Sequence, residues 1–147
     1  MKQSIVVAFA AVVFLVMGGA IIAWSVFQGG GVEENFDIIP HFTDESFEKD
    51  VVESSKTRPV LVDFYAPWCY PCKFYEPMLR EMVKELGDSV VIGKVNIDKN
   101  LIGRRLGINR VPTVLIIRDG EIKNAFLGVQ PKETLVKALK EHGATEQ

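Results

Sequence analysis

The sequence predicts an α/β fold, with a mixed central sheet and helices on both faces, preceded by an N-terminal transmembrane helix. Three observations support this. A charge-free apolar run opens the chain, strand-like and helix-like segments then alternate, and two strand-like segments joined by a tight turn come late. We therefore expect an anchor or signal peptide at residues 1–27, a linker at 28–35 and one folded domain at 36–147.

The first segment is long enough to cross a bilayer. No charged residue occurs from Ile5 to Phe27, about 23 residues or about 34 Å of helix, against a hydrocarbon core of about 30 Å. The alternative is a cleaved signal peptide, for which Gly18-Gly19-Ala20 offers small residues, although such signals have apolar cores of only about 7–15 residues. Lys2 predicts a cytoplasmic N-terminus. We expect a single-pass protein with an extracytoplasmic domain or, after cleavage, a secreted or periplasmic one.

Charge and cysteine content argue against a nucleic-acid-binding protein and against a small secreted fold that is held together by a disulfide framework. The 17 basic and 19 acidic residues of the 147-residue chain are scattered, so a nucleic-acid partner is not expected. The two cysteines stand three positions apart, and the loop that a disulfide between them closes is too small to stabilise a fold. A disulfide here is therefore better explained by chemistry than by stability.

The folded domain is predicted to begin with a short edge strand at Asn35–Ile39. A helix follows, with Thr43 or Asp44 as its N-cap. The nearly unbroken apolar run at Val60–Tyr65 is typical of a strand that is covered on both faces.

A helix is predicted from Cys72 to Leu86, because apolar and charged residues there occupy opposite sides. Pro77 lies inside this helix and is expected to kink it, and Gly87 is expected to end it.

The second half of the domain is predicted to contain strands and a short helix at Val90–Ile97, Asn100–Leu106, Thr113–Arg118 and Glu121–Leu127. Asp119-Gly120 predicts a tight hairpin turn between the last two strands. Pro131 is expected in the first turn of a final helix.

The motif Trp68-Cys69-Tyr70-Pro71-Cys72 lies between a buried strand and a helix. A cysteine at a helix N-terminus meets unpaired N–H groups and the positive end of the dipole, which stabilise the thiolate that attacks disulfides. Cys69 is therefore the expected nucleophile. Cys72, one turn further on and expected to be more buried, would resolve the mixed disulfide.

A metal or haem site is not expected around these cysteines. Zinc needs about four ligands, and His41 and His142 are far away in the sequence. Covalent haem attachment needs a histidine after the second cysteine, where this chain has Lys73. We expect no cofactor; the remaining alternative is a pair of inert buried thiols.

Two charged residues interrupt the apolar strands. Asp63 lies six residues before Cys69, and burying its carboxyl is costly unless it is paired or neutral. We interpret it as a proton acceptor or donor for Cys72. Lys94 interrupts the next strand and is expected to pair with Asp63 and tune it. The alternative is that both side chains point to a strand end and water.

Three stretches resemble the thioredoxin family. Val62 to Lys73 resembles its active-site stretch, Gly93 to Asp98 its middle strand, and Val111-Pro112-Thr113 its cis-proline loop. The resemblance covers about residues 36 to 142, in order and without large insertions.

The resemblance implies the thioredoxin fold and dithiol–disulfide exchange, in which Cys69 attacks, Cys72 resolves and Asp63 assists proton transfer. It implies a cis peptide before Pro112. The residues that it implies for contact with the substrate are Trp68, Tyr70, Pro71, Val111 and Pro112.

Some residues depart from the family's usual pattern. Tyr70-Pro71 replaces the common Gly-Pro pair, which influences redox potential and partner choice, and Tyr65 stands where tryptophan is frequent. The apolar run at residues 5–27 is absent from ordinary cytosolic thioredoxins. It is similar to that of membrane-tethered bacterial relatives that reduce disulfides outside the cytoplasm, including those of apocytochromes c. Their frequent long insert is not evident here.

The leading hypothesis is an extracytoplasmic reductase that acts on disulfide-containing or dithiol proteins and is recharged by a membrane electron donor. An oxidase or isomerase that installs disulfides is the second hypothesis, and the redox potential separates the two. The third is a tethered binding module with incidental thiols, which loss of function in Cys69→Ser would exclude.

Overall fold

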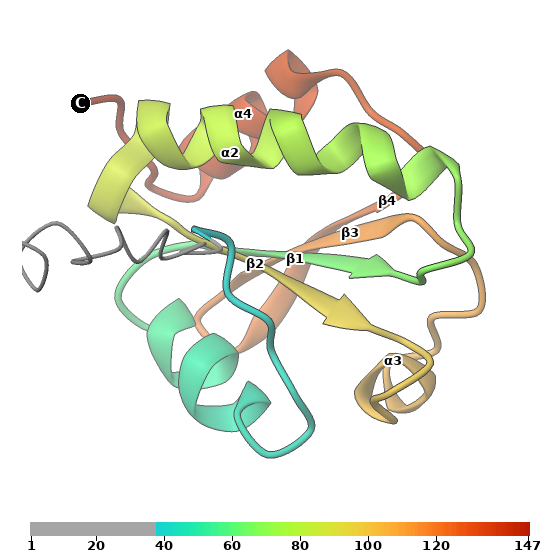
Figure 1. The fold of residues 1–147 in the computed structure, drawn as a ribbon. Helices are drawn as coiled ribbons and strands as arrows, with labels where there is room; N and C mark the ends of the chain where they lie inside the picture. Colours follow the sequence, from blue (N-terminus) through green and yellow to red (C-terminus); the bar gives the residue numbers. More distant parts are fainter. Residues whose placement is uncertain (1–37) are drawn as a thin grey trace, which may run out of the picture. The chain divides into compact units, whose positions relative to one another are not determined.

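The sheet is mixed, as predicted. The structure is a computed structural model that describes residues 38–147 (Figure 1), and its strands lie in the order β2-β1-β3-β4. β1 (Val60–Tyr65) and β2 (Val91–Asn96) run parallel. β3 (Thr113–Arg118) is antiparallel to β1 and to β4 (Glu121–Leu127). The predicted bounds of β1, β3 and β4 are confirmed.

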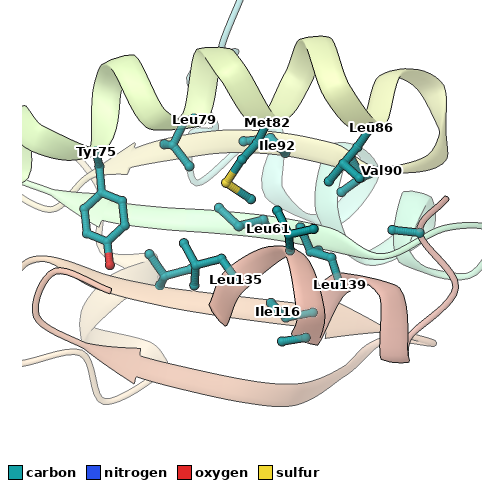
Figure 2. Packing of buried hydrophobic residues seen from close by; sticks show 14 of the residues in the cluster. Leu61, Tyr75, Leu79, Met82, Leu86, Val90, Ile92, Ile116, Leu135 and Leu139 are labelled. Atoms are coloured by element: carbon teal, nitrogen blue, oxygen red, sulfur yellow. The ribbon is translucent and has the colours of Figure 1, made fainter. Parts of the chain in front are cut away.

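Helices flank both faces of the sheet, as expected (Figure 1). α2 (Tyr75–Leu86) and α4 (Lys132–Glu141) cover one face, and η1 (Glu48–Glu53) and α3 (Ile102–Arg105) lie on the other. Because side chains alternate along a strand, each face receives its own apolar core. Figure 2 shows the core beneath α2 and α4, which includes Leu61, Leu79, Met82, Ile92, Ile116, Leu135 and Leu139.

The expected N-cap at Thr43 or Asp44 is wrong for η1, whose N-cap is Phe47 without a side-chain hydrogen bond. The Ser46 N–H donates to Thr43 Oγ1 and the Thr43 N–H donates to Ser46 Oγ, each at 3.2 Å, in the turn that leads into η1. Asp44 instead accepts hydrogen bonds from the N–H groups of Leu101 and Ile102, at 2.8 and 2.7 Å. These N–H groups begin α3 and have no partner within that helix. Asp44 therefore fixes α3 to a distant part of the chain.

The predicted edge strand at Asn35–Ile39 is wrong for Ile38 and Ile39, which lie in a bend; residues 35–37 lie outside the described residues. Pairing with β2 occurs later in the chain. The Lys94 N–H donates to the Pro40 carbonyl and the Phe42 N–H donates to the Lys94 carbonyl, both at 2.9 Å. Proline accepts but cannot donate in a ladder, so the pairing is limited to a single bridge.

The predicted helix from Cys72 to Leu86 is divided. A 3₁₀ turn, η2 (Pro71–Phe74), precedes α2, and Pro77 therefore lies in the first turn of α2. Its missing N–H costs little there, because the first N–H groups of an α-helix have no intrahelical acceptor. Gly87 ends α2 with φ of 49°, as expected from its freedom to adopt positive φ.

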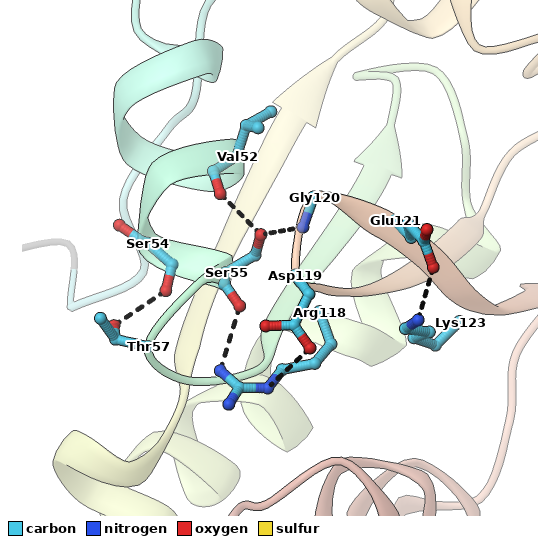
Figure 3. Close-up of polar contacts among 9 residues, drawn as sticks. All are labelled: Val52, Ser54, Ser55, Thr57, Arg118, Asp119, Gly120, Glu121 and Lys123. Carbon is cyan, nitrogen blue, oxygen red and sulfur yellow. Dashed lines mark hydrogen bonds and ion pairs between the residues drawn. The ribbon is translucent and has the colours of Figure 1, made fainter.

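The tight turn at Asp119-Gly120 is confirmed, with φ of 57° and 76°. It is bound to the end of the η1 segment by Ser55, which is fully buried (Figure 3). The Ser55 hydroxyl donates to the Val52 carbonyl at 2.6 Å and accepts from the Gly120 N–H at 2.8 Å. The Ser55 carbonyl accepts from the Asp119 N–H and from Arg118.

No helix among residues 38–147 is long and apolar enough to cross a bilayer. The anchor expected within residues 1–27 and the linker expected at 28–35 both lie outside the described residues.

The buried Tyr75 at the start of α2 connects this helix to the loop after β4 (Figure 2). Its hydroxyl donates to the Gly128 carbonyl at 2.8 Å and accepts from the Gln130 N–H at 2.9 Å. A phenylalanine would keep the ring packing but would leave both backbone groups without this partner.

We predict that Tyr75→Phe lowers the free energy of unfolding by about 1–3 kcal/mol, the cost of leaving buried polar groups unpaired. Denaturant titration of the oxidised chain measures it. Tyr70→Phe is the matched control, because Tyr70 is 70% exposed; it should change stability little. Equal effects of the two substitutions would contradict the prediction.

Candidate functional site

The two cysteines lie in the connection between β1 and α2. They form a disulfide with an S–S distance of 2.01 Å and a Cα–Cα distance of 5.4 Å. The Cys72 N–H, near the start of η2, donates to Cys69 Sγ at 3.2 Å. The expected contact between a helix N-terminus and the Cys69 sulfur is therefore present. Such a donor stabilises a thiolate at that sulfur.

Both cysteines are buried to a similar degree, with exposed fractions of 4% for Cys69 and 7% for Cys72. The expected deeper burial of Cys72 is absent in this disulfide form. The pair packs with Ala66 and against Tyr65, Ile97 and Val111. The disulfide thus lies in apolar surroundings, with little of its surface exposed to water.

A cavity of about 180 Å³ lies beside the disulfide and brings together the four residues predicted to act in catalysis: Cys69, Cys72, Asp63 and Lys94. Its lining also includes Tyr65, Lys73 and Glu76. The cavity therefore joins the redox pair to a set of ionisable side chains.

Asp63 is 3% exposed and projects from β1 on the same face as Leu61, toward α2. Its Oδ1 atom has no hydrogen-bond partner among the described residues. Burial raises the pKa of the carboxyl to about 7, despite the opposing effect of the Lys94 charge; the Glu76 charge raises it further. The alternative that Asp63 points to water at a strand end is therefore wrong.

Lys94 lies directly opposite Asp63 in the parallel β1–β2 register. The ion pair that its Nζ makes at 2.9 Å is with Glu76 Oε2, on α2, where pairing with Asp63 had been expected. Lys94 also lies over the Tyr65 ring, at 5.8 Å from the centroid. It acts on Asp63 through its charge, which lowers the pKa of that carboxyl against the larger effect of burial.

The side chains expected to contact a substrate surround the disulfide but do not line the cavity. Trp68 is 69% exposed, and its indole N–H donates to Asp98 Oδ2 at 3.1 Å. Tyr70 and Pro71 are exposed as well, and the Tyr70 ring packs edge-on against Phe74 at 5.8 Å. An exposed aromatic surface therefore borders the redox pair.

The Val111–Pro112 peptide bond is cis, as the resemblance implies. Val111 packs against the cysteine cluster, and Pro112 is buried. The Pro112 carbonyl accepts a hydrogen bond from the Gly128 N–H at 2.9 Å, which connects this loop to the end of β4.

Glu76 and Asp98 also lie at the site, although neither was predicted from the sequence as a site residue. Glu76 lies on the charged side of the predicted helix, where a solvent-exposed residue is expected. The signal for its role is the Lys94 charge on a neighbouring strand, which needs a partner when buried. Asp98 is the last residue of the stretch Gly93 to Asp98 that resembles the middle strand of the family. Its carboxylate accepts the hydrogen bond that orients Trp68.

Comparisons with known proteins agree with this geometry. The family model for thioredoxin matches residues 38–141. Thioredoxin 1 of Synechococcus elongatus is 42% identical over 101 residues, covering 68% of this chain and 92% of the relative. Thioredoxin of Bacillus subtilis is 39% identical over 101 residues, covering 68% and 93%. Thioredoxin of Rickettsia felis is 45% identical over 95 residues, covering 64% and 89%.

The raised pKa of Asp63 predicts a pH-dependent penalty on stability. The carboxyl ionises near 3.8 when unfolded and near 7 when folded, so the folded state binds the extra proton between these values. Stability is thus lost as pH rises from about 4 to about 7, by at most roughly 4 kcal/mol. In Asp63→Asn the penalty is absent.

Denaturant titrations of the oxidised proteins at several pH values measure this effect. The stability of Asp63→Asn relative to the unsubstituted chain should rise across that window and level off above it. Asp88→Asn is the matched control, because Asp88 is exposed in the folded chain. A difference between Asp63→Asn and the unsubstituted chain that is constant with pH would contradict the prediction.

Proposed function

We propose that this chain, which belongs to the thioredoxin family and is a protein-disulfide oxidoreductase, reduces the disulfides of other proteins on the extracytoplasmic side of a membrane. The observation that carries the exchange chemistry is that Asp63 and Cys72 line one cavity, because the resolving thiol needs a group that takes its proton. Asp63 and Pro71, which keep the site thioredoxin-like, favour the reducing direction. The apolar run at residues 5–27, with Lys2 before it, supports the location.

The reaction begins with both cysteines reduced. The Cys69 thiolate attacks one sulfur of the substrate disulfide, which forms a mixed disulfide and releases the other substrate sulfur as a thiolate. Cys72 then loses its proton and attacks the Cys69 sulfur. The second substrate sulfur leaves as a thiolate, and Cys69 and Cys72 form the disulfide seen in the structure. Two electrons pass to the substrate.

Asp63 takes the proton of Cys72 in the second step. A base works best when its pKa lies near the working pH, and burial places that of Asp63 at about 7. Lys94 assists through its positive charge, which favours the ionised carboxylate. Trp68, Tyr70 and Pro71 border the place where a substrate would lie, and the backbone at Val111 and Pro112 pairs with the substrate chain.

A membrane electron donor returns the pair to the dithiol form after each turnover. The second candidate is disulfide formation or isomerisation, which export and Tyr70 between the cysteines would permit, because this position influences redox potential. The equilibrium potential distinguishes the two candidates.

We predict a potential near that of thioredoxin, about −270 mV, for the Cys69–Cys72 couple in the full chain. Equilibration with glutathione or dithiothreitol buffers measures it. Cys72→Ser should accumulate mixed disulfides with substrates, and Cys69→Ser should form none. A potential well above about −180 mV, in the range of isomerases and oxidases, would overturn the reductase proposal.

The location has its own test in the full chain expressed in bacteria. A labelling cysteine is placed at the exposed Lys137 of α4 (Lys137→Cys), with both native cysteines changed to serine. We predict that a membrane-impermeant maleimide labels it in intact spheroplasts, and that alkaline carbonate leaves the chain in the membrane fraction. Release by carbonate would indicate signal cleavage. Labelling only after lysis would contradict the extracytoplasmic location.

A further inference from the structure

Glu76 is a second carboxylate at the cavity beside the cysteines, and in the described part of the chain it contacts Lys94 and Arg80. Its Oε2 atom lies 2.9 Å from Lys94 Nζ, and its Oε1 atom lies 2.8 Å from Arg80 Nη2. The Lys94 side chain is only 9% exposed, whereas that of Glu76 is 41% exposed. Glu76 therefore holds a nearly buried ammonium group from the solvent side.

The Lys94 ammonium group also acts on Asp63, the carboxyl that is predicted to exchange a proton with Cys72. Lys94 and Asp63 are register partners on adjacent strands, and both line the cavity with Cys72. Among the described residues, Asp63 and Glu76 are thus both carboxyl groups near the Lys94 charge, and Glu76 adds a negative charge at the cavity. Like charges near a carboxyl make it hold its proton more tightly.

We propose that Glu76 is a positioning residue for proton transfer at Cys72: it holds the Lys94 ammonium group at the cavity and adds negative charge beside Asp63. The expected consequence is that Asp63 releases its proton at a higher pH than it would without Glu76. This assignment rests on the proposed function, in which Asp63 receives the Cys72 proton. It gives Glu76 a role that its place on the outer side of α2 does not suggest.

The elements packed around Asp63 differ in the groups that they bring near its carboxyl. β3, on the other side of β1, places the uncharged Val114 opposite Asp63. Arg80 pairs with the Oε1 atom of Glu76. On α2, burial raises the pKa of the Tyr75 hydroxyl, and the nearby Asp63 charge raises it further. The groups that line the cavity with Asp63 come from β1, η2, α2 and β2, and they are Tyr65, Cys69, Cys72, Lys73, Glu76 and Lys94.

The alternative role for Glu76 makes the opposite prediction. If Glu76 merely kept Lys94 close to Asp63, its loss would let the ammonium group move away, and Asp63 would hold its proton more tightly. If Glu76 competes for Lys94, its loss strengthens the effect of Lys94 on Asp63, and the proton is released at lower pH. The sign of the change therefore separates the two roles.

The test is Glu76→Gln in the full, oxidised chain, where the disulfide-bonded cysteines do not titrate. Difference infrared spectroscopy follows the C=O stretch of the protonated Asp63 carboxyl, identified by its absence in Asp63→Asn. We expect the midpoint to move to lower pH by roughly 0.5–1 unit. An unchanged midpoint, or one moved to higher pH, would overturn the assignment.

Two variants serve as controls. Glu85→Gln removes a carboxylate from the same helix, where it pairs with Lys132 at 2.7 Å, away from the cavity; its midpoint should match that of the unsubstituted chain. Glu76→Asp keeps the charge and should restore at least part of the original midpoint. A shift of the same size in Glu85→Gln would mean a general charge effect and would overturn the assignment.

The positioning role of Glu76 has a separate readout. The acid limb of the pH–rate profile for disulfide exchange should move with the Asp63 midpoint in Glu76→Gln, and Glu76→Gln should not move it when Asp63→Asn is also present. A limb that moves in the double variant would overturn the assignment. The infrared titration needs neither substrate nor a direction of electron flow. An oxidising redox potential would therefore overturn the reductase proposal alone.

Discussion

The parallel pairing of β1 with β2 places the Asp63 and Lys94 residues opposite each other, with both side chains toward α2. Burying either charge in a sheet of aliphatic residues costs free energy. Because α2 follows the cysteine pair, the helix that Cys72 leads into also brings Glu76 to the same cavity. A register slip of one residue would turn Asp63 to the opposite face, away from Cys72. The chemistry of this thioredoxin-fold site thus depends on strand register.

Several elements could be predicted from the sequence because their signals are local. Aliphatic runs mark β1 and β3, and Asp119-Gly120 supplies the positive φ values that end one hairpin strand and begin the next. The edge strand at Asn35–Ile39 was mispredicted at its last two residues, because pairing with β2 depends on which backbone groups near Pro40 meet Lys94. That meeting is a tertiary contact without a pattern of its own.

The residues of the site could likewise be predicted only where their signal in the sequence is local. The cysteine pair and Asp63 could be found, because a carboxyl inside an aliphatic run is visible in the sequence. The partner of Lys94 could not be found. Glu76 looks like any residue on the polar side of an amphipathic helix, and only the packing of α2 over β2 brings its carboxylate to the buried ammonium group.

The single bridge at His41 has a mechanical consequence. The Pro40 carbonyl and the Phe42 N–H bond to the two backbone groups of Lys94, each at 2.9 Å. Gly93 leaves room for the Phe42 ring, which a Cβ at this position would meet at 2.3 Å. A displacement of residues 40–42 would therefore move the backbone of the β2 residue whose ammonium group acts on Asp63. The position of the Lys94 ammonium group, and with it the proton affinity of Asp63, would follow such a movement.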